Sequence, residues 1–108
     1  MTSHEHIVVF RFNRPVPASM TDGFLAALRA FPGQIPGILD LSAGLNDTEE
    51  SENAHGYSLG LRITFESLAA LQTYRPHPLH QAFVASLNGL VDHVIVMDYP
   101  ITPATPTH

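Results

Sequence analysis

The sequence of 108 residues predicts an α+β domain of the ferredoxin-like type, with βαββαβ order and helices on one face of a four-stranded antiparallel sheet. Three observations predict it. The length suits one domain with one core. Segments with the alternating apolar pattern of strands and segments with the apolar spacing of helices follow one another in that order. The absence of cysteine excludes a disulfide framework. We expect one domain over residues 1–108, with an ordered core at about 6–99 and a tail at 100–108.

The first strand and the first helix are indicated by the spacing of their apolar side chains. Residues 6–12 are rich in β-branched and aromatic side chains and end before a proline, which is typical of a strand. One face of this strand carries His6, Val8, Phe10 and Phe12. From position 18 or 19, apolar residues recur at steps of four, four and three, which predicts a helix ending at Pro32-Gly33. That apolar stripe consists of Met20, Phe24, Leu28 and Phe31.

Two more strands and an acidic loop follow in the middle of the chain. Residues 38–44 give a second strand after a Pro-Gly turn, and residues 57–65 alternate well enough for a third. The third strand carries on one side Tyr57, Leu59, Leu61, Ile63 and Phe65. Residues 46–55 contain four carboxylates and no apolar side chain larger than alanine, so we expect a solvated loop there.

Two short helices and a last strand complete the predicted order. Glu66-Ser67 opens a helix that stops at Arg75-Pro76, because proline disfavours helical geometry in the residue before it. Pro78 restarts a helix at once, since proline suits the first helical position, and this helix runs to Asn88-Gly89. Residues 91–99 form the final strand.

One face of the predicted sheet has no helices to cover it. Four apolar side chains would be exposed there in a monomer if they share that face: Ile7, Val9, Val94 and Val96. An open apolar face on so small a domain predicts a partner, most economically a second copy of the chain. We therefore expect a homodimer joined through the open sheet face.

Composition excludes several classes of function. Ten acidic and five basic residues give a formal charge of -5 without any basic cluster, so we expect no nucleic-acid partner. The sequence holds no apolar run of the ~18 residues that a membrane span needs and no secretory signal, which indicates a cytoplasmic protein without a membrane partner. It also lacks a Gly-rich phosphate loop and a nucleophile elbow, so we expect neither a nucleotide cofactor nor a covalent nucleophile.

The densest chemical information lies at the predicted corner between the last two helices. Tyr74 ends one helix, and His77 and His80 lie at the start of the next. A neutral imidazole in an apolar pocket can abstract a proton, while a protonated phenol donates to a developing oxyanion. The apolar lining of such a pocket would come from Phe10, Phe24, Leu61 and Phe83.

Each of these polar residues also has a structural interpretation. His77 could be a helix cap, and Tyr74 could bury its ring and bond its hydroxyl to the backbone. His80 could be a satisfied core histidine, and His6 could bond to Asp98. The pairs His4/His6 and His77/His80 have plausible metal-ligand spacing, but spacing identifies no third ligand, so we expect no metal.

Several segments together resemble the stress-responsive A/B-barrel (Dabb) family. The resemblance spans residues 6–99 and is carried by residues 6–12, Ile35-Pro36-Gly37, Gly56-Tyr57, Phe65-Glu66-Ser67, Tyr74, His77-Pro78-Leu79-His80 and Asp98-Tyr99. It implies a homodimer in which two sheets pack face to face into a barrel, with a small cavity between sheet and helices in each subunit.

The resemblance also implies roles for particular residues. In polyketide-cyclase members, a tyrosine and a histidine matching Tyr74 and His80 act as acid/base groups without metal or organic cofactor, and a histidine matching His6 lines the cavity. Two positions that are polar in such a pocket are Leu28 and Leu59 here, which leaves substrate and activity open.

Our hypothesis is a cytoplasmic homodimer that binds a small apolar or aromatic, polyketide-like molecule. Tyr74 and His80 would supply cofactor-independent chemistry of the cyclase or lyase type. The expected substrate-contacting residues are His6, Val8, Phe10, Phe24, Leu28, Leu59, Leu61, His77 and Phe83. The alternative is a non-catalytic, stress-associated binding or assembly module, because one fold hosts many functions.

Overall fold

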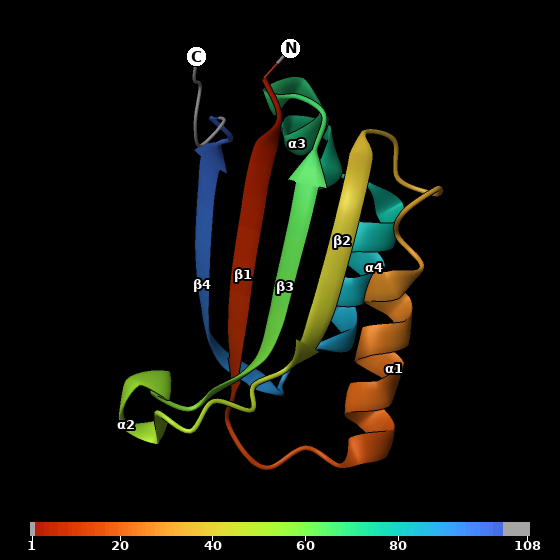
Figure 1. Ribbon diagram of the computed structural model, residues 1–108. Coiled ribbons are helices and arrows are strands. Elements are labelled where there is room, and N and C mark those ends of the chain that lie inside the picture. Colours follow the sequence, from red (N-terminus) through yellow and green to blue (C-terminus); the bar gives the residue numbers. More distant parts are fainter. Residues whose placement is uncertain (1, 103–108) are drawn as a thin grey trace.

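A computed structural model describes residues 2–102 and has a four-stranded antiparallel sheet at its centre (Figure 1). The strands are β1 (His4–Phe12), β2 (Ile38–Leu45), β3 (Tyr57–Phe65) and β4 (Val91–Pro100). Their order in the sheet is β2-β3-β1-β4, which places the N-terminal strand between its two neighbours β3 and β4. The predicted βαββαβ ferredoxin-like fold is confirmed.

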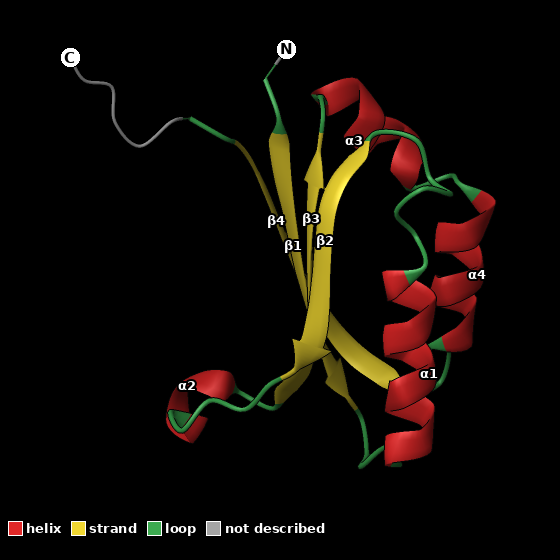
Figure 2. Ribbon diagram, turned by 45° about the vertical axis from the view of Figure 1, so that its right-hand side comes forward, coloured by secondary structure: helices red, strands yellow, loops and turns green. Residues whose placement is uncertain are grey.

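Three helices cover one face of the sheet: α1 (Ala18–Arg29), α3 (Leu68–Tyr74) and α4 (Pro78–Ser86) (Figure 2). A single helical turn, α2 (Ser51–Ala54), lies on the opposite side. It interrupts the segment predicted as a plain loop, although that segment is largely exposed. None of the helices within residues 2–102 has the length and apolar character that crossing a bilayer requires.

The helices bury slightly different faces from those that their apolar spacing predicts. Phe24 and Leu28 of α1 are buried as expected, but Met20 is 39% exposed. The buried face of α1 is completed by Thr21 and Leu25, so the stripe is rotated away from Met20. In α3, the first residue, Leu68, is exposed, whereas the last, Tyr74, is buried.

The register of the sheet corrects the predicted composition of the open face. The β1–β4 pairs are Ile7–Met97, Val8–Val96, Val9–Ile95 and Phe10–Val94. Directly opposed residues point to the same face, so Val94 and Val96 lie on the helix side with the buried Val8 and Phe10. The prediction that they share the open face was wrong, because a one-residue change of register moves every side chain to the other face.

The apolar side chains of the open face are instead Ile7, Val9, Ile95 and Met97. Arg62 lies on the same face, since it is opposite Ile7, and it donates to Asp40 at 2.6 Å and to Glu5 at 3.4 Å. The guanidinium hydrogen bond lowers the pKa of Asp40. The open face is therefore apolar at its centre, with an ion-pair network beside it.

Candidate active site

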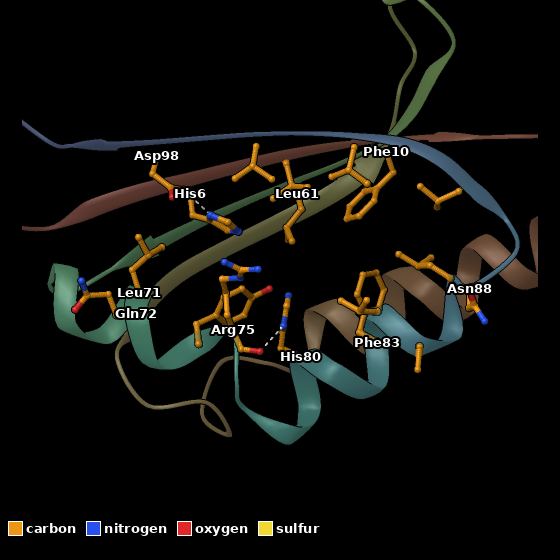
Figure 3. Close-up of a pocket in the computed structure, with 18 of the residues that line it drawn as sticks. His6, Phe10, Leu61, Leu71, Gln72, Arg75, His80, Phe83, Asn88 and Asp98 are labelled. Atoms are coloured by element: carbon orange, nitrogen blue, oxygen red, sulfur yellow. Dashed lines mark hydrogen bonds and ion pairs between the residues drawn. The ribbon is translucent and has the colours of Figure 1, made fainter.

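A cavity of about 890 Å³ lies between the helix pair α3–α4 and strands β1 and β4 (Figure 3). Its floor includes Val94 and Val96, which no helix covers and which are 42% and 55% exposed. The volume is within the usual range for small-molecule sites, roughly 300–1,000 Å³. The apolar side chains of β4 that share the helix-facing side therefore form part of a cavity wall.

The two helices that meet at the α3–α4 corner each have a capped N-terminus, and α4 begins with a proline. The hydroxyl of Ser67 accepts a hydrogen bond from the Ala70 N–H at the start of α3. Nδ1 of His77 accepts one from the Leu79 N–H at 3.1 Å, and Pro78 begins α4. The sharp turn brings the last residue of one helix beside the first turn of the next.

Tyr74 and His80 meet at this corner on the cavity wall. Their ring centroids are 4.4 Å apart. Nδ1 of His80 lies 2.9 Å from the Arg75 carbonyl oxygen, which can only accept, so Nδ1 is the protonated nitrogen. In the neutral ring Nε2 then carries the lone pair, as a proton acceptor requires. The His80 ring rises from α4 toward the strands in Figure 3.

Burial sets the protonation of both groups. It lowers the pKa of His80, against the hydrogen bond to the Arg75 carbonyl, and the neighbouring His6 and the positive charge of Arg75 lower it further. The imidazole is therefore neutral at pH 7. Burial also raises the pKa of Tyr74, which keeps the phenol protonated. The pair thus combines a neutral base with a proton donor.

The Tyr74 hydroxyl is available for a ligand. Tyr74 is only 2% exposed, and within residues 2–102 its hydroxyl has no hydrogen-bond partner. No side-chain oxygen or nitrogen of this region is both sealed from solvent and unpaired, so the hydroxyl faces open space. The bond to the backbone that a purely structural tyrosine would make is not formed.

His6 lies on the other side of Tyr74 and is oriented by a carboxylate. Nδ1 of His6 lies 2.5 Å from Oδ1 of Asp98, and the two residues are directly opposed on β1 and β4. The His6 ring is nearly buried, and its centroid is 5.5 Å from that of Tyr74. His6 thus bonds to Asp98 and lines the cavity at the same time. Figure 3 shows both side chains on the sheet side.

The remaining predicted site residues separate into two groups. Four of the apolar ones line the cavity: Val8, Phe10, Leu61 and Phe83. Four predicted substrate contacts lie elsewhere: Phe24, Leu28, Leu59 and His77. Leu28 and Leu59 are fully enclosed in the core, because α1 packs on the β2 side of the sheet, and Phe24 packs edge to face against Phe83. His77 serves as the α4 cap.

Other lining residues were not predicted as part of the site, notably Leu71, Arg75, Val94, Val96 and Asp98. Val94, Val96 and Asp98 are placed on the cavity side by the pairing of β4 with β1. The pattern of residues within a single strand does not reveal that pairing. In the described part of the chain, no three His, Asp or Glu side chains are grouped to hold a metal ion. The two predicted histidine pairs therefore gain no third ligand there.

Comparison with known proteins identifies one family over nearly all of the described residues. Residues 5–101 match the family model described as the stress responsive A/B barrel domain (Dabb). An A/B barrel domain-containing protein of Arabidopsis thaliana, At5g22580, is 24% identical over 97 residues, covering 90% of this chain and 85% of its own. Olivetolic acid cyclase from Cannabis sativa is 24% identical over 95 residues, covering 88% and 93%.

Solved structures share the fold along nearly all of the chain. A dimeric protein of unknown function with a ferredoxin-like fold from Bacteroides fragilis is 25% identical, with a TM-score of 0.79, covering 92% of this chain and 96% of that one. Hydroxynitrile lyase from Passiflora edulis has the same fold at a TM-score of 0.80 and 20% identity, covering 96% and 97%. The chain belongs to the stress-responsive A/B-barrel (Dabb) domain family.

Proposed function

We propose that this protein is a homodimer whose cavity binds a small, mainly apolar molecule and catalyses cofactor-independent acid/base chemistry of the cyclase or lyase type. The observation that carries the proposal is the contact of Tyr74 with His80 on an 890 Å³ cavity. The relatives that are named as a cyclase and a lyase support the reaction class. The apolar lining supports the substrate class.

The geometry suits proton transfer at a carbon next to a carbonyl group. Nε2 of His80 takes the proton, and the electron pair of the broken C–H bond moves to the carbonyl oxygen as an enolate forms. The Tyr74 hydroxyl donates a hydrogen bond to that oxygen. The enolate then attacks a second carbonyl carbon, as in ring closure, and the alkoxide oxygen formed there takes the proton from the imidazolium. Alternatively, the enolate itself takes that proton back.

His6 supplies a second polar group at the same end of the cavity. Its bond to the Asp98 carboxylate holds the ring in one orientation and makes Nδ1 the donor. In the neutral ring, the other nitrogen is an acceptor for a hydroxyl group of the ligand. This role requires no metal and no organic cofactor.

The homodimer follows from the open face of the sheet. Ile95 and Met97 are 48% and 60% exposed there, beside Ile7 and Val9. Such a patch on a small domain is a typical protein interface. The structural relative from Bacteroides fragilis is dimeric, which supports the same assembly here. The helices lie on the other face, so the dimer leaves the helix-side cavity in each protomer.

Exchange of the α-protons of 4-phenylbutan-2-one in D₂O, followed by proton NMR, tests the catalytic proposal. We expect the protein to accelerate exchange, and His80→Ala and Tyr74→Phe each to lower the rate about a hundredfold. His55→Asn is the matched control, because His55 is exposed and outside the cavity, and asparagine tolerates its left-handed backbone.

The outcomes separate the two functional classes. Equal exchange by the protein and both variants contradicts the acid/base assignment. Binding of the ketone without any exchange assigns the alternative, a non-catalytic binding module. A change in the His55→Asn variant as large as that in His80→Ala shows that the effect does not come from the cavity.

A further inference from the structure

Arg75 is an unusual cation in this chain. The protein has five basic residues, all arginines, against ten acidic ones. Arg11 and Arg62 are held by carboxylates, Arg29 donates to a backbone carbonyl, and Arg14 lies in an exposed loop outside the cavity. Arg75 lines the cavity, and among the residues that the structure describes no carboxylate lies within 4 Å of its guanidinium. In a protein with surplus acid, this cation is left free at a binding site.

The position of Arg75 places its charge beside the reactive groups. It follows Tyr74 directly, and its carbonyl holds His80. Figure 3 shows its guanidinium extending from the helix corner toward the sheet, at the end of the cavity where His6 lies. Its positive charge adds to the burial that lowers the pKa of His80, which agrees with this placement.

The cavity is polar at one end and apolar at the other. The polar end has Arg75, Tyr74, His80 and His6, with the carboxylate of Asp98 held by His6. The other end is formed by aromatic and aliphatic side chains, Phe10, Phe83, Leu87, Val91 and Val94. In Figure 3, Phe10 and Phe83 lie away from His6 and Asp98 along the cavity. A ligand that fits both ends has a polar head and an apolar body.

We infer that the cavity selects amphipathic monocarboxylates, with the carboxylate on Arg75 and the hydrocarbon part against Val94 and Val96. This inference names the substrate class of the proposed function and rests on it. An arginine fork binds a carboxylate through two parallel hydrogen bonds. The hydrocarbon covers the two valines that the helices leave exposed. A single arginine, at an end of the cavity whose lining also includes the Asp98 carboxylate bonded to His6, does not suit a polyphosphate or a cation.

Decanoate and its neutral counterpart decan-1-ol test the inference by isothermal titration calorimetry on the full chain. We expect decanoate to bind about three- to fivefold more tightly, the gain typical of a partly exposed ion pair. Arg75→Met keeps an unbranched apolar stem without the charge, and it should abolish the preference while leaving decan-1-ol binding unchanged. Arg75→Lys should keep part of it. Arg14→Met, at an exposed loop arginine outside the cavity, should change nothing.

Two results overturn the inference on their own. They are equal binding of decanoate and decan-1-ol by the unmodified protein, and an unchanged preference in Arg75→Met. Either would leave the catalytic proposal intact, because ketone exchange is measured separately. Conversely, if the unmodified protein prefers decanoate but does not catalyse ketone exchange, the inference is supported and the catalytic proposal is contradicted. Binding of neither compound contradicts both.

Discussion

The imidazole of His80 lies across the phenol ring of Tyr74, with ring centroids 4.4 Å apart, although the two residues belong to different helices. The backbone fixes this contact. α3 ends at Tyr74, His77 caps α4, and the Arg75 carbonyl accepts the His80 Nδ1–H at 2.9 Å. A proton acceptor and a proton donor are therefore held together at the wall of one cavity.

His80 should titrate below the ordinary histidine pKa of about 6.5. Burial disfavours its protonated form most, and the neighbouring His6 and the charge of Arg75 add to this effect. The unfolded chain therefore binds this proton more readily, so the stability that neutral His80 preserves is lost as the pH falls through 6.5. NMR titration of the ring measures the pKa, and Arg75→Met should raise it. A pKa at or above 6.5 in the unmodified protein would contradict the assignment.

Leu28→Ala and Val94→Ala should have opposite effects on stability and binding. Leu28 is fully buried in the core, so its truncation should lower the free energy of unfolding by about 2–5 kcal/mol and leave ligand affinity unchanged. Val94 is 42% exposed on the cavity wall, so its truncation should weaken ligand binding at little cost in stability. Urea unfolding measures the stability of the two variants, and isothermal titration calorimetry with decanoate measures their binding. Both are carried out at one protein concentration. Unchanged binding in Val94→Ala would remove β4 from the site.

Gly37→Ala should disturb the base of α3. Gly37 has a φ of 90°, and a Cβ there would lie 2.4 Å from the Cβ of Ala70. Gly33 has a similar φ of 86° with nothing within 4 Å, so Gly33→Ala measures backbone strain alone, about 1–2 kcal/mol. We expect Gly37→Ala to cost clearly more in urea unfolding. Equal losses for both variants would show that α3 moves aside without cost.

Charges introduced into the open sheet face should separate the protomers. Val9 and Ile95 are paired at the centre of that face. Val9→Lys or Ile95→Lys would bury a charge in the interface, so sedimentation velocity at micromolar concentration should show a dimer for the unmodified protein and a monomer for each of these two variants. Met20→Lys, on the exposed side of α1, is the control. A monomeric unmodified protein would contradict the proposed assembly.

The fold could be predicted from the sequence because each element carries a local signal. Pro76 and Pro78 mark the corner between α3 and α4, and the bounds predicted for the third strand, 57–65, are those of β3. The predicted alternation holds from Leu59 to Phe65, whereas Tyr57 lies beyond a register shift and pairs with Arg11. The short turn α2 lacks any apolar periodicity, so nothing in the sequence distinguishes it from a loop. Local patterns determine where elements begin and end.

The site was less predictable because it depends on how elements pack. The sequence spacing identified Tyr74 and His80, which are close along the chain. Val94 and Val96 were assigned to the wrong face, because the β1–β4 register depends on a partner 80 or more residues away. The position of Leu28 in the apolar stripe of α1 shows that it faces inward, but not whether it lines a cavity or packs in the core. Only the placement of α1 over the β2 side of the sheet distinguishes the two.

A double-mutant cycle on ketone exchange tests the central claim, that Tyr74 and His80 act as one acid/base unit. Exchange is measured for the unmodified protein, Tyr74→Phe, His80→Ala and the double variant, with substrate saturation compared in each. We predict that the double variant loses little more activity than either single variant, since each removes the same step. Exchange rates that match the unmodified protein in all three variants, or losses that simply multiply, would contradict the claim.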